Sequence, residues 1–95
     1  MDDYGQKYKA LIHLRKTHVL KKQTGLTETH HIKLASLWPS LANDTNNLVE
    51  LTIYEHVLAH KYLYLWYKEK YGELDNRYHT AAKAYYFMTT SRDGI

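Results

Sequence analysis

The sequence predicts one small α+β domain, in which a helix is followed by a two-stranded ribbon and two further helices. A chain of 95 residues has room for a single compact domain, spanning residues 1–95. Apolar residues recur at helical spacing near the start and in the second half, whereas two short stretches between them have the character of strands. The chain has no cysteine, so neither a disulfide framework nor a thiolate zinc site is possible.

The first half of the chain predicts a helix and a strand. We expect a helix over residues 4–17 and then a looser region that ends at Gly25. The apolar stripe of this helix comprises Tyr8, Leu11 and Ile12. Residues 26–33 alternate enough to form a short strand, and residues 34–46 contain the single proline and an Asn/Asp-rich end that marks a turn.

The second half predicts a strand and two helices. Residues 47–51, NLVEL, are expected to pair with the first strand. Thr52 then begins a helix, and Glu55 three positions later completes a capping box. This helix is expected to stop at Gly72, and a last helix is expected over residues 76–90.

Five polar residues form the most informative pattern of the chain: His30, His31, Asn47, His56 and His60. His56 and His60 are four residues apart in a predicted helix, so both rings project from one face. The doublet lies in a predicted strand, where successive side chains point to opposite faces. Imidazole is both a common metal ligand and a base suited to neutral pH, so the pattern predicts a metal site with a general base beside it.

The stretch from Glu28 to His60, ETHHIKLASLWPSLANDTNNLVELTIYEHVLAH, resembles the HNH endonucleases with a ββα-metal (His-Me) finger. The similarity is to the phage and homing-type branch, whose signature is roughly E-x-HHI, a variable loop and NLV-x-LT-x-x-EH-x-x-AH. The chain differs in the loop, where Leu34 stands in place of a proline that relatives usually carry. The resemblance implies a ββα-metal core over about residues 26–71, with flanking helices.

The resemblance also implies an activity, that of a metal-dependent DNA endonuclease encoded by a phage or a mobile element. His30, His56 and His60 would bind one divalent metal ion, and His31 would activate water. Asn47 would orient His31, through its side chain or through backbone contacts across the ribbon. Three neutral nitrogens favour Zn²⁺, Ni²⁺ or Mn²⁺, but relatives also work with Mg²⁺, so all four ions stay open.

Other polar residues admit two interpretations. Glu28 and Glu55 could orient the ligand imidazoles, although the capping box alone accounts for Glu55. We expect His13, His18 and His79, which lie outside the pattern, to be solvated side chains.

The basic residues between Lys7 and Lys22 suit a DNA partner, in keeping with a net charge of +3. Lys16, Lys21 and Lys22 are the candidate phosphate contacts, and the alternative is an ordinary solvated helix face. Trp38 in the loop could stack on a base, although a place over the small core is the simpler expectation.

A second class of function stays open, because a chain this short has no appended DNA-recognition domain. It could be a catalytically reduced HNH-derived binding protein, for example an inhibitor of a host nuclease or defence system, with a protein partner. A purely structural zinc site would call for a fourth protein ligand, and none is obvious. Without an apolar span or signal peptide we expect no membrane association and a place in the cytosol, that of the host cell if the gene is phage-encoded.

Overall fold

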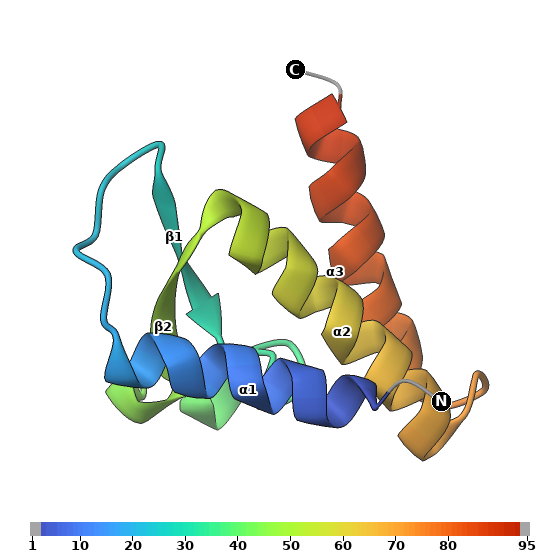
Figure 1. Cartoon of the computed structure of the whole chain (residues 1–95). Helices are drawn as coiled ribbons and strands as arrows, with labels where there is room; N and C mark the ends of the chain where they lie inside the picture. The colour runs from blue at the N-terminus through green and yellow to red at the C-terminus, as the bar shows by residue number, and fades with distance from the viewer. Residues whose placement is uncertain (1–2, 94–95) are drawn as a thin grey trace.

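A computed structural model describes residues 3–93 as one small compact α+β domain (Figure 1). The elements in chain order are α1 (Tyr4–Thr17), β1 (Thr27–His31), two 3₁₀ turns (Pro39–Leu41 and Thr45–Asn47), β2 (Leu48–Thr52), α2 (Ile53–Tyr71) and α3 (Asn76–Asp93). The predicted class and order of elements are confirmed, because the described part of the chain holds three α-helices and one two-stranded antiparallel sheet.

Local hydrogen bonds explain where the helices begin and end. Helix α1 starts where predicted, because the Asp3 side chain accepts a hydrogen bond from the Gln6 amide. Helix α2 has the predicted capping box, in which Thr52 and Glu55 exchange side-chain and backbone hydrogen bonds. It ends at Gly72, whose φ of 89° lies in the region that favours glycine.

The first strand is shorter than predicted, and the second is displaced by one residue from its predicted bounds. The first strand covers only the middle of the predicted 26–33, and the second begins one residue later than the predicted 47–51. The pairing places His30 opposite Val49 and His31 opposite Leu48. Because side chains alternate along a strand, His30 shares the inner face with Val49, while His31 lies on the other face.

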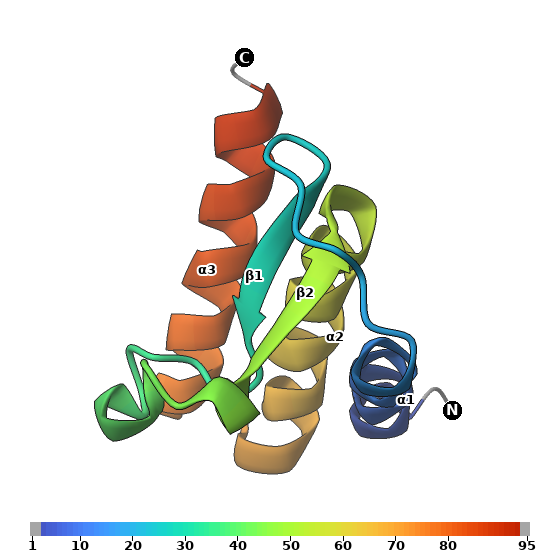
Figure 2. The same cartoon turned by 90° about the vertical axis from the view of Figure 1, so that its left-hand side faces the viewer.

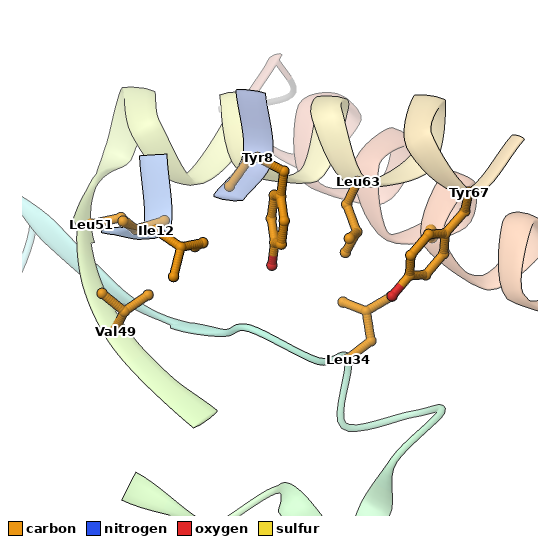
Figure 3. Packing of buried hydrophobic residues seen from close by; sticks show 9 residues of the cluster. Tyr8, Ile12, Leu34, Val49, Leu51, Leu63 and Tyr67 are labelled. Carbon is orange, nitrogen blue, oxygen red and sulfur yellow. The ribbon is translucent and has the colours of Figure 1, made fainter. Parts of the chain in front are cut away.

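The helices enclose this inner face. Figure 2 shows the ribbon in front of α2, with α3 on the side of β1 and α1 on the side of β2. Figure 3 shows how side chains of α1 and α2 meet those of β2 and of the segment after β1. The members of this core that Figure 3 labels are Tyr8, Ile12, Leu34, Val49, Leu51, Leu63 and Tyr67. Within residues 3–93, no helix combines the length and apolar character that crossing a bilayer would require.

Candidate metal centre

Three histidines from two elements meet on the inner face of the ribbon. His30 comes from β1, and His56 and His60 come from successive turns of α2. Each offers one ring nitrogen within 4.8 Å of those of the other two, and the ring centroids are 4.9–5.2 Å apart. These three residues are therefore close enough together to hold one metal ion.

The hydrogen bonds of His30 decide which of its nitrogens is available. The Tyr8 hydroxyl donates its single proton to the carbonyl of Ile32 at 2.6 Å. At its 2.8 Å contact with His30 Nε2 it must therefore accept, so Nε2 carries the proton and Nδ1 carries the lone pair. This Nδ1 is buried and has no hydrogen-bond partner among the described residues. A buried polar atom without a partner is costly, and a metal ion would satisfy it.

His56 is oriented by a carboxylate. Its Nδ1 lies 2.8 Å from Glu28 Oε1, and because an ionised carboxylate can only accept, Nδ1 is the protonated nitrogen. The lone pair is thus on Nε2. Partners of this kind fix the ring of a metal-binding histidine and raise its basicity. The contact also places one negative charge beside a site that would receive a cation.

Burial keeps two of the three rings neutral. His30 is 1% exposed and His60 is 8% exposed. Burial, followed by the nearby histidines, lowers the pKa of His30 well below its ordinary value. Burial, followed by His56, lowers the pKa of His60 to about 4. The Nδ1 of His60 is, like that of His30, buried without a hydrogen-bond partner among the described residues. Both rings are therefore uncharged at neutral pH, the form in which imidazole binds a metal.

His31, the next residue along β1, is held by a backbone carbonyl. Its Nε2 donates to the Ala42 oxygen at 3.0 Å, since a carbonyl can only accept. This bond fixes the tautomer and leaves the lone pair on Nδ1. His31 is only partly buried, and it is near enough to His30 to contribute to the lowering of that residue's pKa.

Asn47 is buried, but its side chain bonds the backbone of the loop rather than His31. Its Oδ1 accepts from the Lys33 amide at 2.7 Å, and its Nδ2 donates to the carbonyls of Lys33 at 2.9 Å and Leu41 at 3.2 Å. Leu41 precedes Ala42, whose carbonyl holds His31. Asn47 therefore acts on His31 indirectly, by fixing the ends of the loop that presents this carbonyl.

The three lysines proposed as phosphate contacts lie in different surroundings. The Lys16 ammonium donates to the carbonyls of Asn46 and Leu48, at 3.0 and 3.1 Å, so it braces the start of β2. Lys21 is exposed. Lys22 lines an open groove of about 740 Å³ that also reaches His56 and the α3 residue Phe87. Of the three lysines, Lys22 is thus the one that lines a groove adjoining the histidine cluster.

Two residues of this centre could not be recognised as such in the sequence. Tyr8 was placed on the apolar stripe of its helix, where it does lie, 3% exposed, but its hydroxyl also fixes His30. The signal was available in part, since a buried tyrosine usually finds a hydrogen-bond partner. The role of the Ala42 carbonyl could not be recognised from the sequence, because every residue has a backbone carbonyl group.

The remaining polar residues follow simpler rules. Glu55 caps α2 and also accepts hydrogen bonds from Arg15 at 2.7–3.0 Å, which lower the pKa of this carboxyl. His13, His18 and His79 are exposed, as expected.

No family model, no curated protein and no solved structure matches this chain, so similarity to known proteins does not assign it to a family.

Proposed function

We propose that the chain is a metal-dependent DNA endonuclease of the HNH type. The observation that carries the proposal is the juxtaposition of two kinds of histidine along β1. His30 belongs to a cluster of three rings that could hold a metal ion, and His31 has a fixed tautomer with its lone pair on Nδ1. A metal-binding cluster beside a positioned base is what phosphodiester hydrolysis by activated water requires.

The residues divide the chemistry between them. A divalent ion bound by His30, His56 and His60 would act as a Lewis acid toward the scissile phosphate and the leaving 3′ oxygen. His31 Nδ1 takes a proton from the attacking water, whose oxygen forms the new bond to phosphorus as the bond to the 3′ oxygen breaks. The Ala42 carbonyl holds the ring in the orientation that leaves Nδ1 able to accept this proton.

The choice of ion follows from the donor atoms. Three imidazole nitrogens favour Zn²⁺, Ni²⁺ or Mn²⁺, whereas Mg²⁺ prefers oxygen. A set of three protein ligands also leaves room for phosphate and water, as catalytic sites require.

The proposal is tested by incubating supercoiled plasmid with the protein and Mg²⁺, Mn²⁺, Ni²⁺ or Zn²⁺. We expect conversion to nicked or linear DNA with at least one of these ions, and little conversion by the His31→Ala variant. His13→Ala is the matched control, because it removes an exposed histidine outside the cluster. Failure of the parent protein to cleave with any of the four ions would contradict the proposal.

One observation favours a second candidate, a catalytically reduced HNH-derived protein that binds another protein. Several large apolar side chains are well exposed: Tyr54 at 74%, Leu74 at 98%, Tyr86 at 57% and Phe87 at 76%. A contiguous exposed apolar patch often marks a protein-binding site, and of these residues Phe87 lines the open groove that reaches His56. An absence of cleavage in the plasmid assay, together with retained metal binding, would favour this candidate.

A further inference from the structure

A second recess lies between α1, the segment after β1 and the second half of α2. We call it the basic–aromatic pocket, because three lysines and two tryptophans line it: Lys9, Lys33, Lys70, Trp38 and Trp66. Its volume is about 280 Å³, at the small end of ligand-binding pockets, and the nearly buried rings of two tyrosines also line it.

The lysines of this pocket rest on its indole rings. Lys9 Nζ and Lys70 Nζ lie 5.3 and 5.1 Å from the centroid of Trp66. Lys33 Nζ lies 5.8 Å from the centroid of Trp38. Contacts of this kind attract cations to aromatic rings, because the face of the ring carries partial negative charge. No acidic side chain is among the residues that line the pocket, so the charged side chains of its lining are all positive.

We infer that the basic–aromatic pocket binds an unpaired nucleotide of single-stranded DNA. The three ammonium groups suit phosphates. A base would stack on an indole ring in place of a lysine that now covers it, and the released ammonium group would contact the phosphate. Stacking on aromatic side chains is open only to bases outside a duplex, because paired bases cover one another's faces. A duplex presents phosphates alone, which would leave the indoles unused.

The pocket is connected to the metal centre by two groups described above. Tyr8 lines the pocket, and its hydroxyl bonds both His30 Nε2 and the backbone after β1. Lys33 is held at its own amide and carbonyl by Asn47, the residue that also fixes the loop presenting a carbonyl to His31. The pocket and the metal centre therefore share two structural supports. The inference rests on the proposed function in taking DNA as the ligand, and it adds the preference for an unpaired strand.

Binding to this pocket can be measured by intrinsic tryptophan fluorescence. The only two tryptophans of the chain, Trp38 and Trp66, both line the pocket, so their fluorescence reports on its occupancy. We would titrate the protein with an oligothymidine of about eight nucleotides in EDTA, where no metal-dependent cleavage occurs. We expect saturable quenching, weaker quenching by a duplex of the same length, and little quenching by inorganic tripolyphosphate.

Matched variants distinguish binding in the pocket from attraction of DNA by the overall positive charge of the protein. Lys33→Gln/Lys70→Gln removes two pocket lysines, and Lys61→Gln/Lys83→Gln removes two exposed lysines that do not line it. Only the first pair should weaken binding, and it should flatten the dependence of log K on log salt by about 0.7 per lost phosphate contact. Trp38→Ala should weaken oligothymidine binding about 5- to 150-fold, because stacking is worth ~1–3 kcal/mol per base.

Four results would overturn the inference. They are an absence of quenching in the parent, equal binding by the two double-lysine variants, equal binding of duplex and single strand, and competition by tripolyphosphate as strong as that by the oligonucleotide. Because the titration contains no metal, its failure is separable from failure of the proposed function. Plasmid cleavage without quenching would refute nucleotide binding in the pocket and leave the proposed endonuclease activity intact. Quenching without cleavage would support nucleotide binding in the pocket and contradict the proposed endonuclease activity.

Discussion

The neighbouring histidines on the two faces of strand β1 differ in burial and in hydrogen bonding. His30 points inward, is 1% exposed, and has its free nitrogen among two other imidazoles. His31 points outward, is partly buried, and has one nitrogen tied to a backbone carbonyl. Two consecutive residues of the strand thus lie in different environments. His30 is shielded from solvent, which suits a metal ligand, whereas His31 is partly exposed, which suits proton transfer. Removing a group from one face should leave the property of the other face intact.

The largest effect should come from removing a ligand on the inner face. His60→Ala should reduce metal binding below detection by calorimetry, because two remaining imidazoles hold an ion weakly. The melting temperature should then no longer rise when metal is added, since an ion stabilises the fold only as far as it binds. His79→Ala, which removes an exposed histidine, is the control. Unchanged affinity in the His60 variant would exclude it as a ligand.

Removing the group on the outer face should affect catalysis alone. His31→Ala should lower the rate of plasmid cleavage roughly 10²- to 10⁴-fold, the contribution of a positioned base. Its metal affinity should match that of the parent, because His31 is not among the three clustered rings. Cleavage at the parental rate would show that another group activates water.

The burial of the inner face predicts a pH dependence of stability for the metal-free protein. The pKa of His60 is about 4 in the folded chain, and the ordinary value is 6.5. Between these values the unfolded chain binds a proton that the folded chain does not. Stability is therefore full above about pH 6.5 and falls as the pH decreases toward 4, by on the order of 3 kcal/mol. His30, whose pKa is lowered in the same direction, adds to this loss.

Urea unfolding in EDTA at pH 7.5 and pH 4.5 measures this loss. The parent should lose more stability than the His60→Ala variant between the two pH values. A loss of equal size in both proteins would mean that the ring is not protected from protonation by burial.

A smaller effect is expected from the hydroxyl that orients His30. Tyr8→Phe keeps the ring in the core but removes the acceptor for His30 Nε2–H. We expect a 10- to 100-fold loss of metal affinity, as is usual when a partner of a ligand histidine is removed. Tyr62→Phe is the control, because Tyr62 is also partly buried and lies on α2, and its ring packs beside that of Tyr4. Equal affinity in both variants would show that Tyr8 serves only in packing.

The elements of the fold were predictable from local chemistry. Helix α1 and the start of α2 lie where predicted because Asp3, Thr52 and Glu55 supply caps that depend on a few neighbouring residues. The grouping of His56 with His60 follows from helical spacing alone. The strand bounds were less accurate, because pairing across the ribbon, rather than the alternation within 26–33, decides which residues count as a strand.

What could not be predicted depends on contacts between distant segments. The bond from Tyr8 to His30 exists because α1 docks beside the ribbon, 22 residues away in sequence. The role of Asn47 in holding the loop depends on backbone groups, which every residue shares. The basic–aromatic pocket likewise gathers side chains from α1, α2 and the segment after β1, and no short sequence window contains them together.

The loop between the strands is attached to the rest of the centre through main-chain atoms. Lys33 is bonded through its amide and carbonyl, and Leu41 and Ala42 through their carbonyls. Substitution at exposed loop positions such as Ser36 and Ser40 should therefore be tolerated widely, whereas an insertion or deletion would move the carbonyls themselves. Substitution of the exposed side chains of this loop could therefore alter what the surface recognises, provided that the loop keeps its length and the buried Leu34.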